Sequence, residues 1–163
     1  MSIPSTVERI GSYAFNYCTS LASITLPTAL TFIGEHAFRN CTALTSITIP
    51  NSTTFIDLGA FEFCNHLTTV NLPNNLQQIT TYTFSDCTAL TSITLPSSLT
   101  KIESNAFQNT GLTSITIPSS VSVIQNNAFR DCTNLTSITI NKAQDSISGA
   151  PWGATNATVT WTG

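Results

Sequence analysis

The heptapeptide Leu44-Thr45-Ser46-Ile47-Thr48-Ile49-Pro50 decides the fold of this 163-residue chain. Its four residues before the proline alternate polar and apolar side chains, which is typical of a short strand with one buried face. Proline has no N–H group to donate to a neighbouring strand. The heptapeptide therefore predicts a short, half-buried strand that ends at Pro50.

The same pattern returns along the chain at a nearly constant spacing. Prolines recur every 23 residues, with one interval of 22, and six units start near residues 4, 27, 50, 73, 96 and 118. A phenylalanine and an isoleucine follow each proline in step, the latter as Ile10, Ile33, Ile56, Ile79, Ile102 and Ile124. Repeats of this length indicate a solenoid, in which stacked units share one core. We assign residues 1–140 to this repeat region.

The two ends of the chain depart from the repeat. Residues 141–163 form a degenerate seventh unit, with Asn141 in the proline position and Trp152 in the phenylalanine position, and we expect it to act as a C-terminal cap. At the other end, Ile3-Pro4 matches only the tail of a strand. We therefore expect that the chain is cut from a longer protein, or that a partner covers its uncapped N-terminal end. That partner could be a second copy of the chain.

The second half of each unit is predicted to be a turn with a short helical or 3₁₀ piece. In Gly34–Cys41, for example, Ala37 and Phe38 could be buried by a single helical turn. Such a segment is too short to form a stable helix alone, so the core must hold it.

These motifs resemble the BspA-type leucine-rich repeat. The shared pattern is Leu-x-x-Ile-x-Ile-Pro followed by Ala-Phe-x-x-Cys, which is intact at Ala37, Ala60 and Ala128. The resemblance implies an α/β solenoid of about seven rungs, with short parallel strands on the concave face and helical or 3₁₀ turns opposite. Members of this family are mostly surface or secreted proteins of bacteria and mucosal protozoa, several of them adhesins, so the resemblance implies a cell-surface or secreted, bacterial parent protein. No signal sequence is expected after Met1 in this chain.

Composition excludes several classes of function. Charged residues make up 8% of the chain, and its five Lys and Arg face eight Asp and Glu, so no basic surface for nucleic acid is expected. No apolar run approaches the roughly 18 residues of a membrane span, and we expect no membrane insertion. With 29 Thr and 19 Ser, the surface should instead be polar and nearly uncharged.

We find no catalytic or metal-binding pattern. The five cysteines share one position of the repeat, without the close pairs typical of metal sites, and are predicted to be buried thiols. His36 beside Glu35 is interpreted as part of a solvated turn. The sequence predicts no enzyme, no metal and no cofactor.

The outward positions of the strands form the first candidate site, a concave ligand-binding face. It comprises Ser46, Thr48, Thr69, Asn71, Ser92, Thr94, Ser114 and Thr116. These hydroxyl and amide groups suit hydrogen bonding to a protein or glycan. The alternative is that threonine simply favours exposed strand positions.

Two aromatic pairs form the second candidate site, an interface patch. Phe32 and Phe55 occupy a position held in the other units by Arg9, Gln78, Lys101 and Val123, while Tyr17 and Phe63 precede the cysteine position. Exposed aromatic side chains often mark an interface. A local packing variant is the alternative.

The sequence thus predicts a non-enzymatic extracellular interaction or adhesion module with a protein or glycan ligand. A structural spacer or self-assembly unit of a larger surface protein is the competing hypothesis. An enzyme and an ice-binding surface are minor alternatives.

Overall fold

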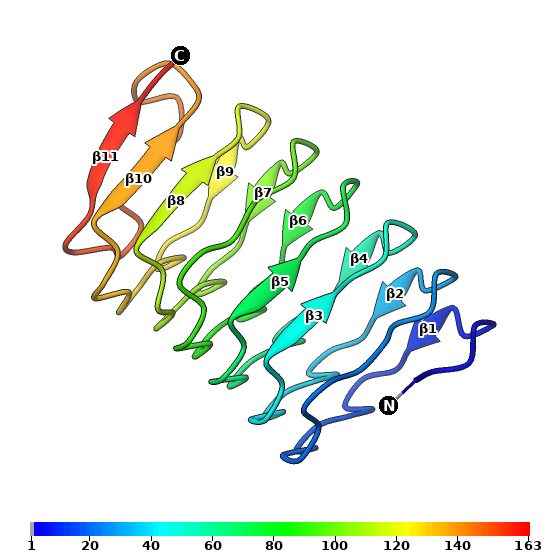
Figure 1. Ribbon diagram of the computed structural model, residues 1–163. Coiled ribbons are helices and arrows are strands. Elements are labelled where there is room, and N and C mark those ends of the chain that lie inside the picture. Colours follow the sequence, from blue (N-terminus) through cyan, green and yellow to red (C-terminus); the bar gives the residue numbers. More distant parts are fainter. Residues whose placement is uncertain (1) are drawn as a thin grey trace.

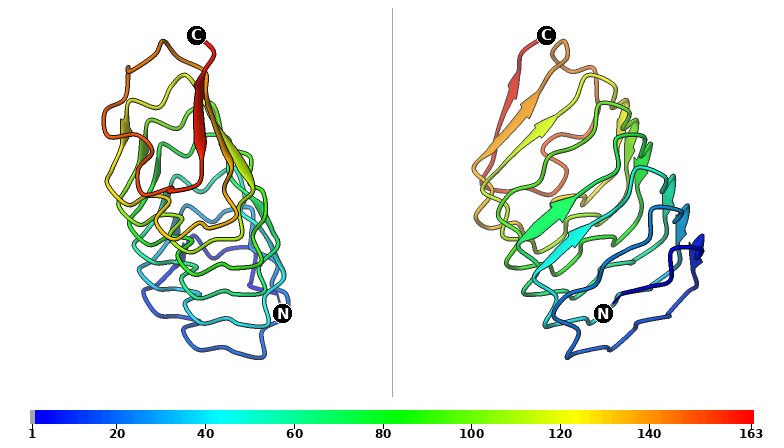
Figure 2. Two further views of the ribbon diagram at one scale, coloured as in Figure 1. Left: turned by 90° about the vertical axis from the view of Figure 1, so that its left-hand side faces the viewer. Right: turned by 45° about the vertical axis from the view of Figure 1, so that its right-hand side comes forward.

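The computed structural model describes residues 2–163, which form a coil of about seven stacked rungs. The N- and C-termini lie at opposite ends of the stack (Figures 1 and 2). One side of the coil carries the longer strands, and we call it the long-strand face; its strands are β3 (Ser46–Thr48), β5 (Thr69–Asn71), β8 (Ser114–Ile117), β10 (Ser137–Ile140) and β11 (Thr158–Trp161). The predicted leucine-rich-repeat solenoid with parallel strands is confirmed.

Equivalent residues of successive rungs pair with each other on this face. In the parallel pair β3–β5, Ser46 lies opposite Thr69 and Ile47 opposite Val70. The central residue of each strand is buried and its two neighbours are exposed, as the alternation of the sequence predicts. The repeat therefore fixes the register, since a slip by one residue would turn the apolar side chains outward.

A second column of parallel strands was not predicted. It consists of two-residue strands that contain the isoleucine six positions after each proline: β1 (Arg9–Ile10), β2 (Phe32–Ile33), β4 (Phe55–Ile56), β6 (Gln78–Ile79), β7 (Lys101–Ile102) and β9 (Val123–Ile124). In each of them the isoleucine is buried. Two residues are too few to show the alternation by which strands are predicted.

The predicted helical piece is wrong in detail, because the described residues contain only strands and turns. In the turn that follows β2, the main-chain N–H groups alternate between two partners. Those of Ala37, Arg39 and Cys41 bond three residues back within the turn, whereas those of His36, Phe38 and Asn40 bond one rung ahead, to the carbonyls of Leu58 (2.8 Å), Ala60 (2.8 Å) and Glu62 (2.9 Å). Beyond its first turn, a helix bonds every successive N–H group internally, whereas here every second group bonds to the next rung, so these segments are not helices.

The core is a stack of aromatic rings surrounded by aliphatic side chains. Neighbouring rings lie 5.1–5.7 Å apart between centroids and within 16° of parallel, in the column Phe15, Phe38, Phe61, Phe84, Phe107 and Phe129. All but Phe15 are fully buried. Each ring thus packs on its equivalents above and below, which is the offset stacking that aromatic pairs favour.

The cysteines form a second column beside the rings. Each buried thiol donates to the main-chain oxygen of a phenylalanine in the preceding rung, as Cys64 does to Phe38 at 3.1 Å. All five are free thiols, and Thr110 takes the equivalent position in the fifth unit, 3.2 Å from Cys132 Sγ. Burial raises the pKa of the Cys41 thiol to about 11 and raises the pKa of Cys64 and Cys87 further.

At the C-terminal end, β11 pairs with β10, so that Val159 lies opposite Ile138 and Trp161 opposite Ile140. Trp152 is buried, and its indole Nε1 donates to the Ser148 carbonyl at 2.7 Å. The Phe129 N–H bonds to the Trp152 carbonyl at 3.1 Å. The seventh rung therefore continues both the column of long strands and the hydrogen bonds between the turns of successive rungs.

Removing one ring from the stack should be strongly destabilising. We expect Phe61→Ala to lower the free energy of unfolding by about 3–5 kcal/mol. The substitution leaves a cavity between the rings of Phe38 and Phe84, which cannot approach each other to fill it. Urea unfolding followed by circular dichroism measures this. The exposed control Thr69→Ala should stay within about 0.5 kcal/mol of the parent. A loss below about 1 kcal/mol for Phe61→Ala would contradict the stacked core.

The thiols should differ sharply in reactivity. In the folded protein at pH 8, the half-buried Cys18 should react first with a thiol-specific chromogen, and the four buried thiols about 100-fold more slowly, because they are both covered and protonated. Cys18→Ser should remove the fast phase, and denaturant should release the others. Several fast thiols in the native state would show that the column is open.

Candidate functional site

The structure places all eight residues of the first candidate site on the long-strand face with exposed side chains: Ser46, Thr48, Thr69, Asn71, Ser92, Thr94, Ser114 and Thr116. They follow the strands from rung to rung. One side-chain bond links two of them, from Asn71 Nδ2 to Thr48 Oγ1 at 3.1 Å. The face presents hydroxyl and amide groups on a rigid frame.

The backbone ladder beneath this face is interrupted. Residues 22–26 and 91–95 have the repeat's strand sequence but belong to none of the named strands, so β3–β5 and β8–β10–β11 form separate sheets. The main-chain distance from Thr45 N to Ala22 O is 3.5 Å, compared with 2.9 Å from Thr68 N to Thr45 O one rung later. The two main chains are therefore farther apart at the first of these junctions.

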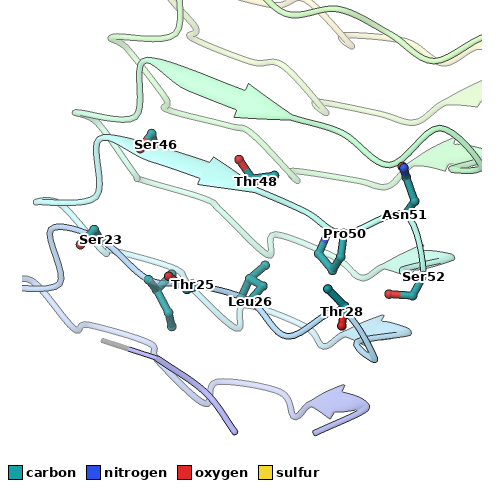
Figure 3. A pocket seen from close by; sticks show the side chains of 10 residues that line it. Ser23, Thr25, Leu26, Thr28, Ser46, Thr48, Pro50, Asn51 and Ser52 are labelled. Atoms are coloured by element: carbon teal, nitrogen blue, oxygen red, sulfur yellow. The ribbon is translucent and has the colours of Figure 1, made fainter. Parts of the chain in front are cut away.

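A hollow lies at each interruption. The largest, about 660 Å³, is lined by residues 23–28 and 46–52, and Figure 3 shows its hydroxyl groups from both rungs. Two more, of about 240 and 360 Å³, lie on either side of Thr94. Their linings contain Ser, Thr, Asn, Pro and aliphatic side chains without a titratable group. This lining can accept and donate hydrogen bonds but offers no acid–base chemistry.

The structure separates the four aromatic residues of the second candidate site into two pairs. Phe32 and Phe55 stack on β2 and β4, with 5.9 Å between ring centroids, and both are half-buried. The Arg9 guanidinium lies 3.9 Å from the Phe32 centroid. Part of this predicted exposed surface is thus covered by its own neighbours.

Tyr17 and Phe63 lie on the turns instead. They flank the Arg39 side chain, whose guanidinium carbon is 5.8 Å from the Tyr17 centroid and 5.1 Å from that of Phe63. Among the described residues, no ring contact joins this pair to Phe32 and Phe55. The four residues do not form one patch.

Around Arg39 lies a group that sequence analysis missed, which we call the turn-edge cluster: Tyr13, Tyr17, Glu35, His36, Arg39, Glu62 and Phe63. Arg39 Nε donates to Glu62 Oε2 at 2.6 Å, and the Tyr13 hydroxyl donates to Glu35 Oε1 at 3.1 Å. The hydrogen bond to Glu62 raises the pKa of Arg39, and the bond to Glu35 raises the pKa of Tyr13. The repeat itself brings these residues together, since partners lie 22 or 23 positions apart.

His36 is held inside this cluster rather than in a solvated turn. Its side chain is only 16% exposed and lies 3.4 Å from Glu62 Oε2 and 3.7 Å from Glu35 Oε1. The Tyr13 ring packs on it at 5.3 Å. The position equivalent to His36 in the next rung is Gly59, where a Cβ atom would overlap the imidazole.

A separate ion pair lies on the short strands. Lys101 Nζ donates to Glu103 Oε1 at 2.7 Å, and Thr81 donates to the other carboxylate oxygen through its main-chain N–H and its hydroxyl. Partial burial would raise the pKa of Glu103, but these hydrogen bonds outweigh burial and lower it. No group of three His, Cys, Asp or Glu within residues 2–163 could hold a metal ion, and none of the described elements is a helix able to span a membrane.

The stacked rungs, the parallel strand columns and the shared core define a leucine-rich-repeat solenoid. The sequence matches the BspA type leucine rich repeat region in six copies, over residues 1–87 and 59–156. The chain belongs to this family. No curated protein matches the sequence.

Several solved structures share the fold. A leucine-rich cell surface protein from Faecalibacterium prausnitzii is 44% identical over 85% of this chain and 38% of its own, with a TM-score of 0.81. A leucine-rich repeat protein from Bacteroides ovatus is 30% identical over 98% and 49%, with a TM-score of 0.73. A leucine-rich repeat protein from T. pallidum is 26% identical over 99% and 68%, with a TM-score of 0.64. The chain spans less than half of the first two proteins.

The contact between Gly59 and His36 can be tested directly. We expect Gly59→Ala to lower the free energy of unfolding by about 1–2 kcal/mol, because alanine is strained at the φ of +59° and would also push against the imidazole. Gly59→Ala should cost less in a His36→Ala background than in the parent, since only the backbone strain at position 59 then remains. Equal stability of Gly59→Ala and the parent in urea would refute this packing.

Proposed function

We propose that this chain is a non-enzymatic recognition module of a cell-surface or secreted protein, which binds a protein or glycan through the long-strand face. The observation that carries the proposal is the continuous exposed array of Ser, Thr and Asn side chains with its hollows at the interrupted junctions. The similar Faecalibacterium protein, described as a cell surface protein, supports the proposed location.

The chemistry of the face favours a ligand recognised by hydrogen bonds. Hydroxyl and amide groups both donate and accept, which suits sugar hydroxyls and exposed peptide groups. The frame is already ordered by its neighbouring rungs, so binding would immobilise little additional chain. With few charges near the face, association should proceed without electrostatic steering.

A structural spacer is the second candidate function. The near-uniformity of the face favours it, because specific protein interfaces usually contain Trp, Tyr or Arg at their centre. A spacer would bind no ligand on this face and would tolerate charges there.

Placing charges on the face separates the two functions. We would measure binding to extracellular-matrix and mucosal glycoproteins by interferometry, with the variant Thr48→Asp/Thr94→Asp/Thr116→Asp. For a recognition module we expect binding at least about tenfold weaker, because carboxylates would be buried without partners. The parent's association rate should change little with salt concentration.

The matched control Asn75→Asp/Gln77→Asp/Asn126→Asp adds the same charge at exposed positions outside the face. It should bind like the parent. Equal weakening by both variants would show that the added negative charge lowers affinity wherever it is placed. Retention of binding by the threonine variant would place the binding site outside the long-strand face. Absence of binding by the parent to any of these glycoproteins would favour the spacer.

A further inference from the structure

The turns that follow the short strands require positive φ at two positions, and the residue types in some rungs suit this requirement while those in others do not. In each of the first six units, the residues two before and two after the core phenylalanine adopt positive φ, between 51° and 64°. Glycine tolerates this region, asparagine, aspartate and histidine are enriched there, and other bulky residues such as tyrosine and phenylalanine are strained. After the phenylalanine, four units carry the expected residues: Asn40, Asp86, Asn109 and Asp131.

The early rungs carry aromatic residues at these positions. Tyr17 and Phe63 replace Asn or Asp after the phenylalanine, and Tyr13, His36 and Tyr82 replace Gly or Asn before it. Burial does not explain them all, because Tyr13 is 50% and Tyr17 is 61% exposed. An exposed bulky side chain on strained backbone lowers stability without filling the core, and such outliers point to function.

The charges of the cluster leave one group available to a partner. Arg39 is neutralised by Glu62, whose side chain is only 14% exposed. Glu35 is 43% exposed, and the bond from Tyr13 uses only its Oε1 atom. Arg39 and the two glutamates together carry a formal charge of −1. The more exposed carboxylate of the cluster is therefore that of Glu35, which lies beside the Tyr13 hydroxyl.

We propose that the turn-edge cluster is a docking site for a protein partner that inserts an arginine side chain beside Glu35. A guanidinium can bond to a carboxylate through two N–H groups and stack on an aromatic face, which the ammonium of lysine does less well. Exposed tyrosines provide rigid, amphipathic contact area around such an anchor. The net negative charge of the chain, −3, also favours a basic partner.

This site is distinct from the long-strand face. It lies on the turns that follow the short strands, and its residues line none of the hollows between residues 23 and 141. A module with both sites could hold a protein partner at the turns while the strand face remains available. The proposal does not depend on the function proposed for that face.

The test is a nuclear magnetic resonance titration of the ¹⁵N-labelled chain with N-acetyl-argininamide. We expect saturable shifts in the amides of residues 13–17 and 35–39, with a Kd on the order of millimolar for so small a probe. N-acetyl-glutaminamide should cause no saturable shift. Glu35→Gln and Tyr17→Asn should each weaken binding at least fivefold.

The chain itself supplies the fold controls. Tyr17→Asn introduces the residue found at the equivalent position as Asn40 and Asn109, so its urea midpoint should be equal or higher than that of the parent. Tyr82→Asn removes a tyrosine from another positive-φ turn position, the one equivalent to Tyr13 but outside the cluster, and should bind the probe like the parent.

Three outcomes would overturn the proposal. The first is no saturable shift with N-acetyl-argininamide, and the second is equal weakening by Tyr82→Asn. The third is a response of the same amides to methyl glucoside in place of the arginine probe, which would assign the cluster to carbohydrate. None of these results bears on the threonine variants of the long-strand face, so the two proposals fail separately.

Discussion

Hydrogen bonding between equivalent positions of successive rungs is the constraint on which the rest of the structure depends. Strand pairs and turns alike bond to a partner 21–24 residues away, so each rung must close at nearly the same length. The fifth unit is one residue shorter, and there Gly111 lies against the Thr88 carbonyl oxygen, where a Cβ atom would overlap it. Absence of a side chain at this point lets the shorter rung stay in register.

Stacking in register multiplies each local feature into a column. One phenylalanine per rung becomes a column of parallel rings, and one cysteine becomes a column of thiols that donate to carbonyls of the rung before. The same geometry places surface residues 22 or 23 positions apart in contact, which is how Glu62 reaches Arg39 and Glu35 reaches Tyr13. A solenoid thus builds both its core and its surface clusters from neighbouring repeats.

The two candidate surfaces differ in how they relate to this regularity. The long-strand face follows the repeat, and its hollows arise where the ladder between rungs is interrupted. The turn-edge cluster departs from the repeat, because aromatic residues stand where the backbone favours asparagine, aspartate or glycine. Local preference and global fold usually agree in natural proteins, so a place where they disagree is a reasonable candidate for function.

The sequence by itself determined the period, most of the strands that precede the prolines, the core residues and the outward face from Ser46 to Thr116, because alternation and spacing depend only on chain order. Whether the segments before Pro27 and Pro96 pair as strands was decided by the tertiary structure. Tertiary structure alone decided the second strand column and the turns without helix, since both rest on hydrogen bonds between rungs. It also separated Phe32 and Phe55 from Tyr17 and Phe63, and enclosed His36 between two carboxylates. Those arrangements depend on the direction in which each side chain leaves its turn, and that direction is set only when the rungs stack.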